Sequence, residues 1–285
     1  PVHEGLVFQE WSCAFTIINN KITVTDADII VGPIYNTLSH KSEFDISLVK
    51  PLNTLDVVFN SNEDKDWGDG TIDNLTTHTY LNYGEYTIKC NLSTITNTLF
   101  DNENILTEIR FGENLTYLNE AFLNSKVLKA ISFPSSLTII DNASFKQCYA
   151  LENIILPPNL TNIGQEAFQN NIKLTNCIFS NSLQTIGNNS FNGCDDLESI
   201  ILPNSLTLLG VSSFSSTFNL TKVRLSNQLL NIPENCFRAC HTLLNIKIPN
   251  GVTTIDALNL KNALCSNPGV QRVSDRYGLT NIQEY

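Results

Sequence analysis

The side chains of this 285-residue sequence that could do chemistry include eight Cys and four His. Only one short stretch combines the two types, with Cys236 and Cys240 followed by His241. Thiolates and imidazoles bind zinc, and a four-residue spacing places two thiols on one face of a helix. A structural zinc site needs about four ligands, and the sequence supplies no fourth ligand nearby. The alternative is that both Cys residues are buried in a repeated structure.

An acidic segment in the first third of the chain offers a second type of site. Its carboxylates are Asp64, Asp66, Asp69 and Asp73. Calcium binds several carboxylate and carbonyl oxygens, so this segment is a weak candidate for a calcium site. The alternative, a solvated turn, is favoured. We therefore expect no metal and no cofactor.

Sequence motifs of the common enzyme classes are missing from the chain. There is no G-x-S-x-G, phosphate-binding loop, GxGxxG or H-E-x-x-H segment, and no assignable Ser/His/Asp arrangement. The sequence therefore predicts a protein that is not an enzyme. A net charge of −11 without a Lys/Arg cluster argues against binding to nucleic acid or to an anionic bilayer. No apolar run is long enough for a membrane helix, so we expect no membrane insertion.

A repeat of 23 residues organises the larger part of the chain. It is marked by Phe122, Phe145, Phe168, Phe191, Phe214 and Phe237. Counted from each Phe, the positions at offsets 6, 9, 11, 15 and 18 are apolar in every repeat. Such periodicity predicts a solenoid, in which each coil buries its apolar residues against the neighbouring coils.

The spacing within one repeat predicts the shape of a coil. Offsets 9 and 11 have the period of a strand with one buried face, and the region around the Phe suits a turn or a short helix. Stacked coils then align their strands in a parallel sheet. Five Cys occupy repeat positions, and Cys148, Cys194 and Cys240 lie two coils apart. That separation is about 10 Å, beyond the reach of a disulfide, so we expect free buried thiols.

The amino-terminal third differs from the repeats in charge and pattern. Residues 1–98 carry five Lys and 13 Asp or Glu, a net charge of −8, and the remainder of the chain carries −3. Alternating apolar runs at 44–48, 55–59 and 86–90 predict antiparallel strands. We therefore expect an all-β region there, with a domain boundary near residue 95.

Two segments of the chain resemble known families. The repeats LENIILPPNLTNIGQEAF at 151–168 and LESIILPNSLTLLGVSSF at 197–214 are similar to the leucine-rich repeats of bacterial BspA-like surface proteins, as is the F-x-x-C at Phe145, Phe191 and Phe237. DWGDGT at 66–71, followed by HTYLNYGEYTIKC at 78–90, resembles the signature of PKD-like β-sandwich domains.

These resemblances imply a fold and a division of the chain into domains. The fold is an all-β PKD-like sandwich followed by an α/β leucine-rich repeat solenoid of about seven coils, each with a strand and a short helix or turn. The expected domains are an unassigned β extension at 1–41, the sandwich at 42–95, the solenoid at 96–262 and a terminal cap at 263–285.

The outward face of the predicted strands is the most informative candidate surface. Offset 10 alternates with the buried offsets 9 and 11, and it carries three Ile in successive coils, with basic residues before and after them. Offset 8 lies on the same face and adds one further Lys. The predicted binding residues are Arg110, Ile155, Ile178, Ile201, Lys222, Arg224 and Lys247. This pattern fits a partner that presents apolar groups and carboxylates. The alternative is that β-branched residues simply pair well across strands.

The sequence therefore predicts a non-catalytic recognition or adhesion module for a protein or glycan ligand. The resemblance to BspA-like proteins implies a cell-surface or secreted protein. The alternative is a structural component of a virus or phage particle, attached to a larger assembly through residues 1–98. The chain lacks Met, which fits removal of either an initiator Met or a targeting segment, so location stays open.

Overall fold

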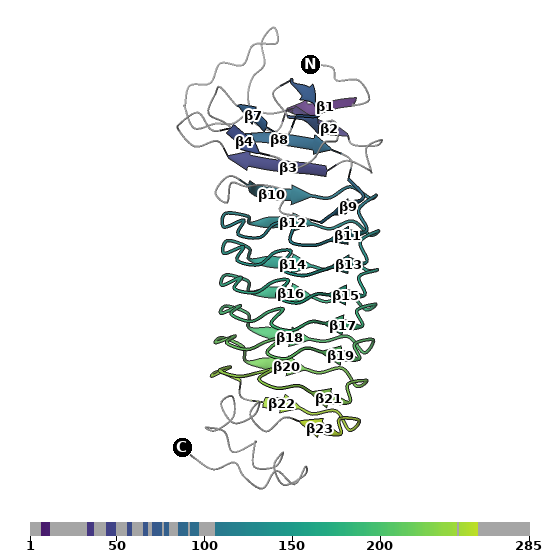
Figure 1. Ribbon diagram of the computed structural model, residues 1–285, viewed down its shortest axis with the longest axis vertical. Helices are drawn as coiled ribbons and strands as arrows, with labels where there is room; N and C mark the ends of the chain where they lie inside the picture. Colours follow the sequence, from purple (N-terminus) through teal and green to yellow (C-terminus); the bar gives the residue numbers. More distant parts are fainter. Residues whose placement is uncertain are drawn as a thin grey trace. The chain divides into compact units, whose positions relative to one another are not determined.

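The computed structural model describes residues 7–11, 33–36, 44–49, 56–58, 65–67, 70–75, 77–79, 85–90, 92–96, 106–243 and 245–255 (Figure 1). The chain divides into two compact units, Pro1–Lys41 and Ser42–Tyr285. In the first unit, β1 (Val7–Trp11) pairs antiparallel with β2 (Pro33–Asn36). The remaining strands all belong to the second unit. No helix occurs among the described residues, and so none of them forms a helix long and apolar enough to cross a membrane.

Two stacks of short strands build the solenoid of the second unit (Figure 1). We call the first stack the front ladder: β10 (Leu106–Arg110), β12 (Ala130–Ser132), β14 (Asn153–Ile155), β16 (Asn176–Ile178), β18 (Ser199–Ile201), β20 (Lys222–Arg224) and β22 (Asn245–Lys247). These seven strands mark seven coils, as predicted. We call the second stack the return ladder: β9 (Thr94–Ile95), β11 (Tyr117–Leu118), β13 (Ile139–Ile140), β15 (Asn162–Ile163), β17 (Thr185–Ile186), β19 (Leu208–Leu209), β21 (Asn231–Ile232) and β23 (Thr254–Ile255).

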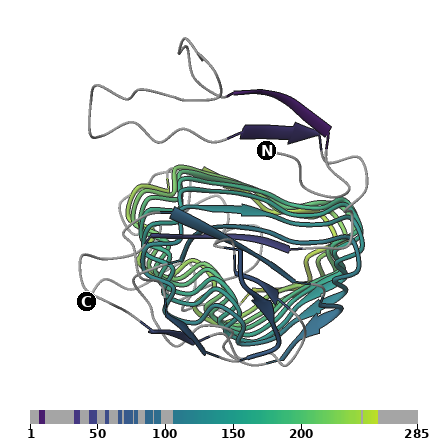
Figure 2. The ribbon, with the colours of Figure 1, turned by 90° about the horizontal axis from the view of Figure 1, so that it is seen from above.

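Successive coils superimpose closely when they are viewed along the stack (Figure 2). Within both ladders the paired strands are parallel and shifted by one repeat, so Ile154 lies beside Cys177 and Ile163 beside Ile186. Equivalent residues therefore stack on one another, which explains the apolar columns in the sequence.

The six Phe of the repeat form a continuous stack through the core. Successive rings lie 5.2–5.9 Å apart between centroids, with interplanar angles of 5–15°. All six side chains are buried. Because each inner ring contacts the ring before it and the ring after it, the stack buries apolar area only when neighbouring coils are in register.

The segment around each Phe is a series of turns, so the expectation of a turn is confirmed and that of a short helix is wrong. Residues two positions before and after the Phe have left-handed backbone angles, as at Glu166 (φ 57°) and Asn170 (φ 61°) around Phe168. Such angles interrupt a right-handed helix. The Phe168 N–H donates instead to the Ser190 carbonyl of the next coil, at 2.8 Å. The backbone bonds of this segment therefore link coils.

An antiparallel sheet continues the front ladder at its amino-terminal end. β3 (Phe44–Val49) pairs antiparallel with β10 on one side and with β8 (Glu85–Cys90) on the other. The resulting six-stranded sheet has the order β12-β10-β3-β8-β5-β6, with β5 (Lys65–Asp66) and β6 (Ile72–Asp73) at its far edge. The first coil of the solenoid therefore has no open front edge.

The other strands of this region form a separate pair, in which β4 (Asp56–Val58) is antiparallel to β7 (Thr77–Thr79). Trp67 and Ile88 are buried. The strands agree with an all-β region, whereas the PKD-like sandwich remains a prediction, as do the four domain boundaries. The predicted cap at 263–285 lies outside the described residues.

Candidate functional site

All seven predicted binding residues lie exposed on the outer face of the front ladder. Their side chains alternate with those of buried residues, so β14, β16 and β20 each show the burial pattern exposed, buried, exposed. We call this set (Arg110, Ile155, Ile178, Ile201, Lys222, Arg224 and Lys247) the front strip. Its three Ile occupy equivalent positions in three successive coils and are exposed by 66%, 50% and 52%. Exposure of this size is unusual for adjacent large aliphatic side chains.

Three basic residues occupy the carboxy-terminal end of the front strip. Lys222 and Arg224 lie two residues apart on the same face of β20, and Arg224 pairs in register with Lys247 of β22. None of the three forms an ion pair with a carboxylate of the described residues, within which Lys146–Glu166 is a pair. The strip therefore carries three uncompensated positive charges in a protein of net charge −11.

The front ladder is interrupted within this strip. Its sheet pairing is continuous for β14-β16 and for β18-β20-β22, but β16 and β18 are not hydrogen-bonded as neighbours. A hollow of about 520 Å³ lies at this break, lined by Asn176, Ile178, Ser199, Ile201 and Arg224 among others. Of the front strip, two apolar residues and one basic residue line this depression: Ile178, Ile201 and Arg224.

At the break, the residue at offset 11 lacks a backbone hydrogen bond that its counterparts make at two paired positions of the ladder. Leu156 donates its N–H to the Ile178 carbonyl across the β14-β16 pair, and Leu202 bonds in the same way to Arg224. Within 106–243, Phe179 makes no such bond to Ile201. The Phe179 ring packs edge-on against Phe191, with centroids 5.5 Å apart. The front ladder has a second break, between β12 and β14. There too offset 11 holds a Phe in one coil, Phe133, and a Leu in the next, Leu156.

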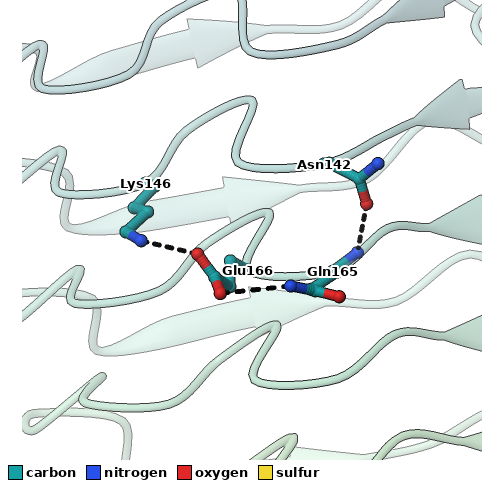
Figure 3. A network of polar contacts seen from close by, with 4 residues as sticks. All are labelled: Asn142, Lys146, Gln165 and Glu166. Carbon is teal, nitrogen blue, oxygen red and sulfur yellow. Dashed lines mark hydrogen bonds and ion pairs between the residues drawn. The ribbon is translucent and has the colours of Figure 1, made fainter.

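A polar network lies on the turn side of the solenoid (Figure 3). Lys146 pairs with Glu166 of the next coil at 2.5 Å, and Gln165 donates its side-chain N–H to the same carboxylate. The hydrogen bond from Lys146 lowers the pKa of Glu166, against the opposing effect of partial burial. The Asn142 side-chain oxygen accepts the backbone N–H of Gln165 at 3.0 Å. Since every contact joins neighbouring coils or residues, this network stabilises stacking.

The zinc candidate is divided between the core and the surface, because its two thiols are buried and its imidazole is exposed. Cys236 and Cys240 are fully buried, whereas His241 is exposed and stacks on Phe218 at 5.8 Å. Cys236 contacts the Ser213 hydroxyl at 3.2 Å, and Cys240 contacts Thr217 at 3.0 Å. Burial raises the pKa of Cys236 to about 12 and that of Cys240 to about 11. Both thiols are therefore protonated at neutral pH.

The prediction of free thiols is confirmed for five Cys: Cys148, Cys177, Cys194, Cys236 and Cys240. At offset 3 the Cys residues alternate with smaller or polar residues along the stack. Cys194 donates its S–H to the Phe168 carbonyl at 3.2 Å, and the equivalent thiols do the same. Between them lies Asn171, whose side-chain oxygen accepts the Cys148 N–H at 2.8 Å. This column serves packing.

The acidic calcium candidate is only partly described. Asp66 lies in β5 and Asp73 in β6, on two paired strands, while Asp64 and Asp69 fall outside the described residues. Among the side chains that the structure describes, no group of three or more His, Cys, Asp or Glu is arranged to hold a metal.

Two structural features were not found from the sequence. Gly164, Gly187 and Gly210 stack at one corner of the solenoid. A Cβ on Gly187 would lie 2.6 Å from the Gly164 carbonyl carbon, so only glycine fits there. All three Gly stand four residues before a Phe of the repeat, and this recurrence in the sequence could have predicted their close stacking. The second is the exposed corner pair Phe218 and His241, at offset 4.

The repeats of the solenoid match a known protein family. The family described as BspA type leucine rich repeat region matches in six copies, over residues 74–190 and 161–284. A crystal structure of a leucine-rich repeat protein from Eubacterium ventriosum is 23% identical, with a TM-score of 0.49, covering 53% of this chain and 41% of that one. A leucine rich cell surface protein from Faecalibacterium prausnitzii is also 23% identical, with a TM-score of 0.35 and coverages of 53% and 49%.

A leucine-rich repeat protein from Bacteroides ovatus is 18% identical, with a TM-score of 0.36, and covers 82% of this chain and 99% of its own. The chain spans less than half the length of the first two structures. No curated protein matches the chain. The family match extends from residue 74 to residue 284, well over half of the sequence, and the stacked coils provide the structure that such repeats require. The protein belongs to the BspA type leucine rich repeat family.

Proposed function

We propose that this protein is a non-catalytic recognition module that binds a protein ligand through the front strip. The observation that supports the proposal is the row of three exposed Ile side chains in successive coils. Water contact with such a row is unfavourable, and burial of one Ile against a partner gains about 1.5–3 kcal/mol. The stacked coils also fix the backbone that carries these side chains, so binding orders only the side chains themselves.

The exposed side chains of the front strip are aliphatic and basic, and it contains no carboxylate or imidazole to transfer a proton. A glycan ligand is less well suited than a protein, because three aliphatic side chains offer a sugar few hydrogen bonds. Membership of the BspA type family supports a location at the cell surface. Neither the family match nor the similar structures support a component of a virus particle.

We further propose that residues 42–95 form a PKD-like domain that mounts the solenoid. The support is a buried Trp67 next to the GDGT segment, in which Gly70 has a backbone φ of 96° that favours glycine. Pairing of β3 with β10 joins this region directly to the first coil.

Binding to arrayed surface, matrix and serum proteins and to arrayed glycans tests the main proposal. We expect the chain to capture at least one protein, and Ile178→Asp to weaken that binding by about tenfold or more with an unchanged circular dichroism spectrum. The matched control is Leu208→Asp, because Leu208 is 58% exposed on the return ladder. Loss of binding in the control, unchanged binding in Ile178→Asp or capture of glycans alone would refute the proposal.

A further inference from the structure

The basic end of the front strip has the geometry of a site for several carboxylates. Lys222 and Arg224 lie two residues apart on β20, on either side of the buried Val223. This spacing places them about 7 Å apart on the same face of the strand. Lys247 lies on the next strand, about 4.8 Å from Arg224. Like charges at these distances repel one another, and no described carboxylate forms an ion pair with them. An anionic partner would relieve that repulsion.

The hollow at the β16-β18 break adjoins this basic group. Arg224 lines the hollow together with Ile178 and Ile201, so a single ligand can contact the aliphatic and the cationic part at once. Asn176 of β16 and Ser199 of β18 also line the hollow and supply polar groups. The volume of about 520 Å³ exceeds that of one aliphatic side chain.

We propose that the strip binds an extended acidic segment of a partner protein, with an aliphatic side chain in the hollow and carboxylates on Lys222, Arg224 and Lys247. This inference rests on the proposed function and specifies its ligand. From β16 to β22 the segment crosses three coil steps, about 14 Å, which four to five extended residues span. One aliphatic residue followed within five residues by two or three Asp or Glu therefore satisfies the site.

A sulfated glycan would satisfy the cations equally well, but it would leave the aliphatic part of the strip unmatched. Ile178 and Ile201 are each at least half exposed beside the hollow, and a chain of sugar sulfates carries no aliphatic group to cover them. The combination of apolar and basic groups favours a peptide, and the glycan becomes an outcome of the test.

Selection from a random dodecapeptide phage library against the full chain tests the inference. We expect enriched peptides to combine one aliphatic residue with two or more acidic residues within five positions. Synthetic copies of these peptides should bind about tenfold or more weakly to Arg224→Glu and to Lys247→Glu, and their affinity should fall as NaCl rises. The matched control is Arg238→Glu, which makes the same charge change at an exposed residue outside the strip. It should leave binding unchanged.

Several results would overturn the inference. Enrichment of neutral or basic peptides, or no enrichment, would contradict the proposed chemistry. Equal weakening by Arg224→Glu and Arg238→Glu would reduce the effect to net charge. Binding of heparin in place of the peptides would identify a sulfated glycan. A ligand from the protein array that is lost in Ile178→Asp but retained in Arg224→Glu would refute this inference and leave the proposed function intact.

Discussion

At the scale of single residues, the absence of a side chain at one corner sets how closely the coils approach. Gly164, Gly187 and Gly210 occupy the same position in three successive coils. A Cβ on Gly187 would lie 2.6 Å from the Gly164 carbonyl carbon and 2.7 Å from the Gln165 nitrogen. Both atoms belong to the backbone, which cannot move without separating the coils.

We therefore expect Gly187→Ala to destabilise the protein by about 1–3 kcal/mol, the usual cost of overpacking. The control is Gly251→Ala, because the nearest atoms to an added Cβ there are 3.5 and 3.8 Å away. Urea denaturation of both variants checks the prediction, and equal stability of the two would contradict it.

The buried thiols provide a second test at the residue scale. Burial raises the pKa of all five described Cys, to about 12 for Cys236. Because the thiolate is the reactive form, we expect no alkylation of these Cys by iodoacetamide in the folded protein at pH 8.

The contribution of the buried thiols to the free energy of unfolding is complete below the pKa of a Cys in the unfolded chain, about 8.5. It is lost as the pH rises from that value through the raised pKa values of the folded protein. Peptide mapping by mass spectrometry with and without urea measures the labelling. Labelling of Cys236 without urea at pH 8 would refute the assignment.

At the scale of strands, the breaks in pairing coincide with particular residues in both ladders. A Phe at offset 11 followed by a smaller Leu coincides with both breaks next to β14 and β18, whereas Leu156 followed by Phe179 pairs normally. In the return ladder, Pro233 follows β21 and has no N–H to donate. Its counterpart Gly187 donates to Ile163 at 2.8 Å. The break between β19 and β21 lies at this Pro.

Replacement of Phe179 by Leu tests the explanation of the break at the front strip. A Leu at 179 matches Leu202 in size, so we expect its N–H to bond to the Ile201 carbonyl. The exchange rate of this amide hydrogen should then fall about tenfold or more relative to the original protein. The removal of the ring opens space beside Phe191, so the variant should also lose about 1 kcal/mol or more. Hydrogen exchange by NMR measures the first effect, and an unchanged rate would show that Phe179 does not cause the break.

At the scale of the whole Ser42–Tyr285 unit, the amino-terminal sheet protects the first coil. Ile46 of β3 lies between Ile88 of β8 and Ile109 of β10, so one strand joins the sheet to the solenoid. Without it, the edge of β10 would be free to pair with another molecule.

We expect Ile46→Pro to lower stability by about 3 kcal/mol and to cause association that depends on protein concentration, because Pro removes a ladder hydrogen bond in a central strand. Light scattering after size-exclusion chromatography measures the association, with Ile46→Val as the control. A monomeric Ile46→Pro protein would show that β3 does not protect the edge.

The sequence by itself determined the repeat and therefore most of the solenoid. Because equivalent residues stack, the columns at Phe168 and Ile154 reported burial directly, and the alternation beside Ile178 predicted an exposed strip. It also predicted the free thiols at Cys148 and Cys194 from their distance along the stack.

Only the tertiary structure decided how neighbouring coils meet. Whether the segment at Phe168 forms a helix or turns depends on hydrogen bonds to the next coil, such as that to Ser190, and a single repeat does not contain them. The hollow beside Ile178, the closeness of Gly187 to its neighbour and the pairing of β3 with β10 likewise arise between segments. Periodicity specifies which residues lie inside a coil, whereas the fit between unequal coils, such as Phe179 above Leu202, is settled by their contact.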